Sequence, residues 1–175
     1  MIKNFKVLSN GVNMPSIGFG TYKSGSDEET AKIVKYALEA GYRQIDTASF
    51  YGNEVGIGNG IKESGIKRED LFLVTKLWND DHGYDKTIEA FNKSLERLQV
   101  DYLDLYLIHR FDYETPMEET MEALNELVTS GKVRAIGASA MYGYQFHNLQ
   151  LVAEKNNWAK FQSMQNHYNF TLPRR

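Results

Sequence analysis

The stretch from residue 71 to residue 109, "LFLVTKLWNDDHGYDKTIEAFNKSLERLQVDYLDLYLIH", decides the fold. It begins with an apolar run that ends at Lys76, and it closes with a second apolar run that ends at His109. Between the two runs lies a stripe of apolar residues at helical spacing, formed by Ile88, Phe91, Leu95 and Leu98. A strand–helix–strand order of this length indicates two parallel strands joined by a right-handed helical crossover.

The same alternation extends in both directions along the chain. An Asn10-Gly11 turn between apolar positions predicts a short N-terminal hairpin, and Ser26 with Glu29 forms a capping-box pattern at a helix start. We expect further strands at residues 16–22, 43–48, 133–139 and 160–166, and further helices at 26–41, 54–64, 116–132 and 145–157. The sequence therefore predicts an α/β fold with about six parallel strands, arranged either as an open doubly wound sheet or as a barrel.

Two glycine clusters bear on nucleotide binding. The turn "GFGTY", residues 18–22, has two glycines but lacks the third glycine that opens a helix in the usual dinucleotide fingerprint. The other cluster, "GIGNG" at residues 56–60, lies inside the expected helix 54–64. Because each glycine in a helix costs about 1 kcal/mol relative to alanine, we expect a poorly formed helix there rather than a phosphate-binding loop.

Composition places the chain among globular domains. Its 175 residues are 42% hydrophobic and 25% charged, and the formal net charge of -3 predicts no attraction for nucleic acid or anionic membranes. No apolar run reaches the ~20 residues of a membrane span, and the first residues lack the apolar core of a signal peptide. The absence of cysteine excludes thiolate metal sites, and we predict no metal site. We expect one domain over residues 1–175, located in the cytoplasm.

Four polar side chains lie at or near the ends of consecutive expected strands. Asp46, Lys76 and His109 close the second, third and fourth strands, and Tyr51 lies in the loop after the second. Each has a plainer interpretation when taken alone: an aspartate that caps a turn, a lysine that returns to solvent, or a histidine satisfied in the core. In a barrel of parallel strands, catalytic groups lie at the carboxyl ends, so these four side chains are predicted to meet on one rim.

Together these residue types suit the reduction of a carbonyl group. A tyrosine hydroxyl has a pKa of ~10, and we expect the ammonium of Lys76 to lower it, with Asp46 holding that ammonium in place. His109 is suited to donate a hydrogen bond to the substrate oxygen, which leaves Tyr51 as the general acid. None of these side chains supplies electrons, so the reduction requires a hydride donor of the nicotinamide type.

The strings "NGVNMPSIGFGTY", "YRQIDTASFYGNE", "FLVTKLW" and "DYLDLYLIH" resemble the aldo-keto reductases in order and spacing. The resemblance implies a (β/α)₈ TIM barrel that reduces aldehydes or ketones, small carbonyl substrates, with NADPH, while NADH stays open. It assigns catalytic roles to Asp46, Tyr51, Lys76 and His109. It assigns cofactor contacts to Gly20, Thr21, Asp46, Ser139 and Gln165. It assigns substrate contacts to Tyr22, Trp78 and His109.

The resemblance has two parts. Residues up to His109 are similar to the diketogluconate and aldose reductase branch, whereas "RFDYETPMEETMEAL", "GASAMYGYQF" and "FQSMQNHYNF" are similar to the aryl-alcohol dehydrogenase branch. Ala140 stands where many relatives have asparagine. Because the chain has six expected strands in place of eight, we expect a partial, truncated barrel whose first and sixth strands have unpaired edges and exposed apolar faces, and we expect self-association through these open edges. The alternative function is a non-catalytic barrel fragment or assembly module that binds the cofactor poorly.

Overall fold

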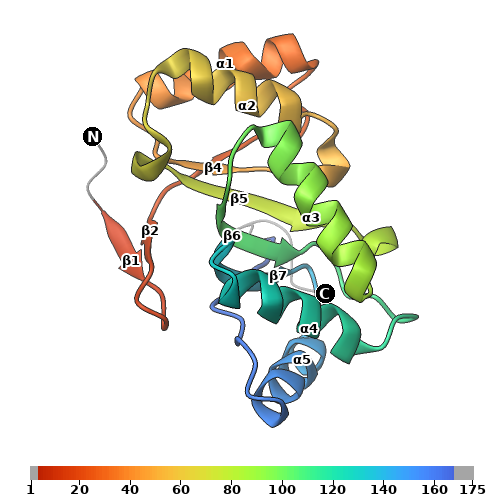
Figure 1. The fold of residues 1–175 in the computed structure, drawn as a ribbon. Coiled ribbons are helices and arrows are strands. Elements are labelled where there is room, and N and C mark those ends of the chain that lie inside the picture. The colour runs from red at the N-terminus through yellow and green to blue at the C-terminus, as the bar shows by residue number, and fades with distance from the viewer. Residues whose placement is uncertain (1–3, 168–175) are drawn as a thin grey trace.

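The computed structural model describes residues 4–167 of the chain. These residues form a six-stranded parallel sheet that curls into part of a barrel, with helices around its outer side and a separate hairpin (Figure 1). The hairpin consists of β1 (Phe5–Val7) and β2 (Asn13–Pro15). The sheet consists of β3 (Phe19–Gly20), β4 (Gln44–Asp46), β5 (Phe72–Leu77), β6 (Leu103–Ile108), β7 (Val133–Ser139) and β8 (Ser163–Gln165). The helices are α1 (Asp27–Glu39), α2 (Glu54–Ser64), α3 (Tyr84–Leu98), α4 (Met117–Thr129) and α5 (Gly143–Lys155), with 3₁₀ turns η1 (Ser49–Tyr51), η2 (Arg68–Asp70) and η3 (Asn79–Asp81).

Each strand of the large sheet pairs with the strand that precedes it in the sequence, in the order β3-β4-β5-β6-β7-β8. Every pairing is parallel, and the registers set Gly20 opposite Asp46 and Ser139 opposite Gln165. The carboxyl ends of the strands therefore share one rim. The predicted fold class, a partial (β/α)₈ barrel with six parallel strands and an N-terminal hairpin, is confirmed.

The apolar core lies on both faces of the sheet, because neighbouring residues along a strand point to opposite faces. On the outer face, Tyr106 of β6 packs edge-on against Phe91 of α3. The inner face presents Phe72, Val74, Leu105, Leu107 and Ala135, and the hairpin covers it with Leu8, Val12 and Met14.

The centre of the sheet is covered on both faces. Every residue of β5 and β6 is buried, since helices cover one face and the hairpin packs on the other. Within residues 4–167, the outer edges of β3 and β8 have no partner strand. Self-association through these edges stays a prediction.

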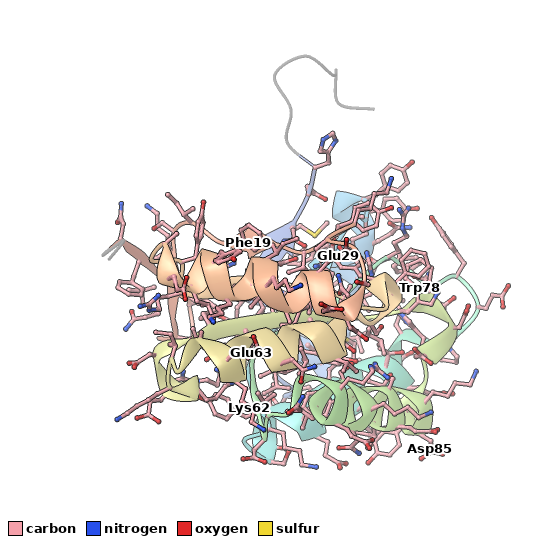
Figure 2. All side chains as sticks on the ribbon, turned by 90° about the horizontal axis from the view of Figure 1, so that it is seen from above. Phe19, Glu29, Lys62, Glu63, Trp78 and Asp85 are labelled. Carbon is pink, nitrogen blue, oxygen red and sulfur yellow. The ribbon has the colours of Figure 1, made fainter. Side chains whose placement is uncertain are left out.

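The first helix begins as the sequence predicts. Ser26 is the N-cap of α1, its hydroxyl accepts a hydrogen bond from the Glu29 amide, and the Glu29 carboxylate accepts one from the Ser26 amide at 2.8 Å. On α2 and α3 the charged side chains of Lys62, Glu63 and Asp85 lie on the solvent side, as the view of all side chains shows (Figure 2). Among the described helices, none is both long enough and apolar enough to cross a bilayer.

The helix expected to be poorly formed is complete. α2 covers all of residues 54–64, and its glycines lie where neighbouring backbones leave no room for a side chain. A Cβ atom on Gly56 would lie 2.4 Å from the carbonyl oxygen of Asp27 in α1, and one on Gly58 would lie 2.7 Å from that of Leu98 in α3. The low helix propensity of glycine is therefore offset by close packing against two other helices, and the prediction of a poor helix is wrong.

Candidate active site

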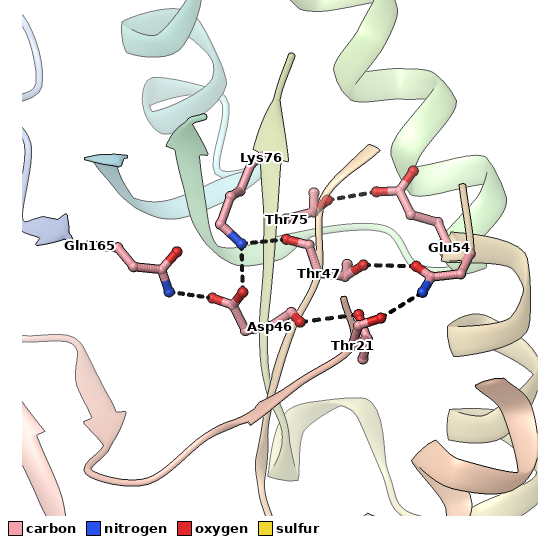
Figure 3. Close-up of polar contacts among 8 residues, drawn as sticks. Thr21, Asp46, Thr47, Glu54, Thr75, Lys76 and Gln165 are labelled. Carbon is pink, nitrogen blue, oxygen red and sulfur yellow. Dashed lines mark hydrogen bonds and ion pairs between the residues drawn. The ribbon is translucent and has the colours of Figure 1, made fainter. Parts of the chain in front are cut away.

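A buried ion pair lies at the centre of the rim. Lys76, near the end of β5, is only 2% exposed, and its Nζ lies 2.5 Å from Oδ1 of Asp46 at the end of β4 (Figure 3). The same ammonium donates a hydrogen bond to the backbone carbonyl of Thr47 at 2.8 Å. Two partners thus compensate for the loss of water around the lysine, and the predicted Lys76–Asp46 pair is present.

Thr21, the residue directly after the neighbouring strand β3, supports this pair. Its backbone amide and its hydroxyl both donate to the carbonyl oxygen of Asp46, at 3.0 and 3.2 Å, and its own carbonyl accepts from the Asn53 side chain at 2.8 Å (Figure 3). Thr21 is fully buried. Its hydroxyl is therefore engaged in fixing the end of β4, and these contacts give no support to the expected role of that side chain in holding a cofactor.

Tyr51 lies at the end of the 3₁₀ turn η1, directly after β4. The turn is held by the Ser49 hydroxyl, which donates to the backbone carbonyl of Lys76 at 3.0 Å. Gly52 follows with a φ of 68°, a left-handed conformation that glycine adopts at no steric cost. These constraints bring the ring of Tyr51 to 5.3 Å from the ammonium of Lys76, measured from ring centroid to Nζ.

Aromatic side chains from several loops surround Tyr51. The ring centroids of Tyr22 and His109 lie 5.0 and 5.7 Å from that of Tyr51. Trp78 stacks on Phe50 with centroids 3.9 Å apart, and its centroid lies 5.1 Å from that of His109. The structure thus gathers the expected substrate residues Tyr22, Trp78 and His109 around one position. Phe50 was missed by the sequence reasoning, although its place beside Tyr51 in the same loop was a signal.

The pKa of His109 is lowered from 6.5 to about 4. Burial is the main cause, the positive charges of Lys76 and Arg110 add to it, and Asp46 opposes it. The imidazole is therefore neutral at neutral pH and carries one N–H donor. Its Nδ1 is buried and has no hydrogen-bond partner among residues 4–167, so it is a polar atom at the rim that the described protein leaves unsatisfied.

The pKa of Tyr51 is raised above its usual 10, against the expectation that Lys76 lowers it. Burial of the phenol is the main cause, and the carboxylate of Asp46 and the neighbouring Tyr22 add to it. The charge of Lys76 is largely offset by Asp46, which lies 2.5 Å away. The phenol therefore stays protonated at neutral pH, which is the state that a proton donor requires.

The residues that the resemblance assigns to a cofactor lie along the same rim. Gln165 of β8 donates from Nε2 to Oδ2 of Asp46 at 2.9 Å, and Ser139 pairs with Gln165 in the β7–β8 register (Figure 3). Gly20 leaves open space, because a Cβ atom there would meet nothing within 4 Å. A cavity of about 280 Å³ lies on the inner side of the sheet, lined by Asp46 and Gln165, by the polar residues Gln44, Ser163 and Asn166, and by the apolar residues Met14, Leu105, Leu107 and Met164.

The donors and acceptors on this rim fit a nicotinamide carboxamide. The amide of Gln165 offers both a donor and an acceptor, and the Ser139 hydroxyl offers either, which matches the paired N–H and C=O of a carboxamide. Ala140, which follows Ser139, adds no polar group and has a φ of 47°. Among residues 4–167, no cluster of three or more histidine, aspartate or glutamate side chains could hold a metal ion.

Comparison with known proteins agrees with this geometry. The model of the aldo/keto reductase family matches residues 16–175. Over 149 residues the chain is 50% identical to the glyoxal reductase of Bacillus subtilis, and the matched segment covers 85% of this chain and 52% of that protein. Over 136 residues it is 48% identical to the 9,11-endoperoxide prostaglandin H2 reductase of Trypanosoma cruzi, and the matched segment covers 78% of this chain and 48% of that protein.

Solved structures give the same result. An aldo/keto reductase from Brucella melitensis superposes with a TM-score of 0.85 at 39% identity, covering 94% of this chain and 63% of that one. An aldo-keto reductase of Bombyx mori in complex with NADP superposes with a TM-score of 0.85 at 34% identity, covering 94% and 58%. The chain spans about half the length of the curated relatives it matches. It belongs to the aldo/keto reductase family.

Proposed function

We propose that this protein reduces aldehydes or ketones to alcohols with NADPH, and that Tyr51 is the proton donor. The observation that carries the proposal is the position of a protonated phenol beside a buried ammonium, with a neutral imidazole facing it. The reductases of Bacillus subtilis and Trypanosoma cruzi, and the NADP complex of the Bombyx mori protein, support the same class of reaction.

The chain's own residues have distinct parts in this proposal. His109 donates a hydrogen bond to the carbonyl oxygen of the substrate and fixes its orientation. As the carbonyl carbon gains a hydride, the oxygen gains negative charge and takes the phenolic proton of Tyr51. The phenolate that remains is stabilised by the ammonium of Lys76, which Asp46 keeps in place. The raised pKa of Tyr51 keeps the phenol protonated until the developing alkoxide, which is a stronger base than a phenolate, takes the proton.

The cofactor and the substrate meet different parts of the rim. Ser139, Gln165 and Asp46 would hold the nicotinamide, and NADPH, when bound, supplies the hydride. The stacked pair of Phe50 and Trp78, together with Tyr22 beside Tyr51, forms an apolar wall that favours carbonyl compounds with an aromatic or aliphatic body.

Replacement of Tyr51 by phenylalanine tests the proposal. Purified protein is titrated with NADPH by fluorescence, and turnover of nitrobenzaldehyde is followed by loss of NADPH absorbance. The Tyr51→Phe variant should lose about 10²- to 10⁴-fold in kcat, the usual contribution of a general acid, while cofactor affinity stays nearly unchanged. Tyr36→Phe, a change on the exposed face of α1, is the control and should behave as wild type.

Two results would contradict the proposal. Turnover by Tyr51→Phe at the wild-type rate would remove Tyr51 from the role of proton donor. Failure of the wild-type chain to saturate with NADPH would favour the alternative, a barrel fragment or assembly module without catalytic activity.

A further inference from the structure

A fully buried carboxylate lies just outside the rim. Glu54, the first residue of α2, is 1% exposed and takes no part in the proposed chemistry. Its Oε1 accepts a hydrogen bond from the Thr75 hydroxyl at 2.6 Å, and its Oε2 accepts one from the Ser94 hydroxyl at 3.2 Å. Arg97 of α3 approaches the same Oε2 with Nε at 2.8 Å and Nη2 at 2.6 Å.

Stability alone does not explain such a group. Removing the Glu54 carboxylate from water costs about as much as its attraction to Arg97, a side chain that is 38% exposed, returns, so the pair contributes little net free energy of folding. Buried polar groups with every partner in place do fix the relative position of the elements that carry them. Here the elements are α2, β5 and α3.

The position that Glu54 fixes is that of the Tyr51 loop. Glu54 follows Tyr51 by three residues, and its partner Thr75 directly precedes Lys76 in β5 (Figure 3). At the other end of the loop, Ser49 is bonded to the backbone carbonyl of Lys76. Residues 49–54 therefore form an arch that is tied to β5 at both ends, and Tyr51 lies in the middle of it.

We propose that Glu54 is a positioning residue, which holds Tyr51 over Lys76 by tying the start of α2 to Thr75 and Arg97. The inference rests on the proposed function, because it states how the chain holds the proposed proton donor. The Ser49 bond fixes only the first half of the arch. In the second half, Asn53 is bonded to Thr47, Thr21 and Ser24, which lie on the β3 and β4 side of the rim. The bond from Thr75 to Glu54 is the one that ties this half to β5, the strand that carries Lys76.

The chain offers a matched control at the opposite end of the strands. Asp104, at the start of β6, is fully buried, and it is paired with Arg68 at 2.7 Å and Arg134 at 2.9 Å. It also accepts a hydrogen bond from the Leu73 amide at 2.9 Å. Asp104→Asn and Glu54→Gln therefore each remove the negative charge of a buried carboxylate that is paired with arginine. Of the two residues, only Glu54 lies beside the rim.

The experiment compares turnover in Glu54→Gln, Thr75→Val and Asp104→Asn. In the first two variants kcat for nitrobenzaldehyde should fall about 10- to 100-fold, as a misplaced catalytic group entails, while KM and the affinity for NADPH change by less than about twofold. Asp104→Asn should lose stability to urea but keep its kcat. Thr75→Val removes a single hydroxyl and keeps the Glu54–Arg97 pair, so it decides the question if Glu54→Gln does not fold.

A second measurement needs no activity. The His109 imidazole is titrated by NMR; burial lowers its pKa to about 4, the charges of Lys76 and Arg110 add to this, and the ring of Tyr51 lies beside it. In Glu54→Gln and Thr75→Val this pKa should rise toward 6.5, and in Asp104→Asn it should not change.

The outcomes separate the two proposals. If the wild-type chain shows no turnover, this result contradicts the proposed function but not the positioning role. The titration of His109 in the variants then decides the role of Glu54. An unchanged kcat in Thr75→Val, an equal loss of kcat in Asp104→Asn, or an unchanged His109 pKa in the two rim variants would each overturn the positioning role.

Discussion

Replacement of Gly60 by alanine adds one methyl group to α2 and should destabilise the packing of α2 against α1. Gly60 is buried in the middle of this helix, against α1. A Cβ atom at this position would lie 2.6 Å from the carbonyl oxygen of Ala31, 2.9 Å from Cβ of Val34 and 3.1 Å from Cα of Ala31. Two of these atoms are backbone, so no side-chain rotation relieves the contact, and α1 and α2 must separate.

The free energy follows from two opposing effects. In an open helical position, glycine to alanine stabilises a protein by about 1 kcal/mol, because alanine has the higher helix propensity. At Gly60 the closest atom must move by roughly 0.8 Å, the difference between 2.6 Å and the 3.4 Å of ordinary contact, and overpacking of this kind costs about 1–3 kcal/mol. Because the obstacle is rigid backbone, we expect a net loss of about 1–2 kcal/mol in the free energy of unfolding.

Urea unfolding followed by circular dichroism measures this difference. The matched control is Gly143→Ala in the first turn of α5, where a Cβ atom would meet nothing within 4 Å. That variant should be neutral or more stable by up to about 1 kcal/mol. If Gly60→Ala were as stable as wild type, or gained as much as Gly143→Ala, close packing would not be the reason for the glycines of α2.

Two further predictions concern the rim. Ala140 has a φ of 47°, so Ala140→Gly should raise the free energy of unfolding by roughly 0.5–1 kcal/mol. The control Ala40→Gly, at a position with a φ of -69°, should lower it. If both variants changed the urea midpoint equally, the backbone at Ala140 would not be strained. The pKa of His109 in the folded chain lies below its unfolded value of 6.5, so between about pH 6.5 and pH 4 the unfolded chain binds more protons than the folded chain. The free energy of unfolding should therefore decrease as the pH is lowered through this range. The loss should be about 1–2 kcal/mol, less than the full pKa difference gives, because the ring is partly exposed. A His109→Asn variant with the same pH dependence would exclude His109 as the source of the loss.

The fold was predictable because its signals are local. Apolar runs of strand length alternate with stripes at helical spacing, and the Ser26–Glu29 capping box sets the start of α1 within four residues. That α2 forms a complete helix despite its three glycines was not predictable in this way. Glycine propensity is a property of the segment alone, whereas Gly56, Gly58 and Gly60 are accounted for by backbone atoms in α1 and α3.

The site was predictable to the extent that strand order determines it. Parallel neighbours align their carboxyl ends, which brings Asp46, Lys76 and His109 together without any knowledge of side-chain contacts. The direction of the Tyr51 pKa depends on how deeply the phenol is buried, and burial is a property of the whole fold. The link between Glu54 and Thr75 joins residues 21 positions apart, and no spacing rule indicates it.

The chain order of the strands has a consequence for how the molecule assembles. Because the strands of the large sheet are ordered as they are in the sequence, every newly synthesised strand and helix can dock on structure that has already left the ribosome. Contacts that join distant parts of the chain, such as the bond from Gln165 to Asp46 across 119 positions, close last. Translation from the amino terminus therefore builds Tyr51, Lys76 and His109 into place before the strand that bears Gln165 emerges.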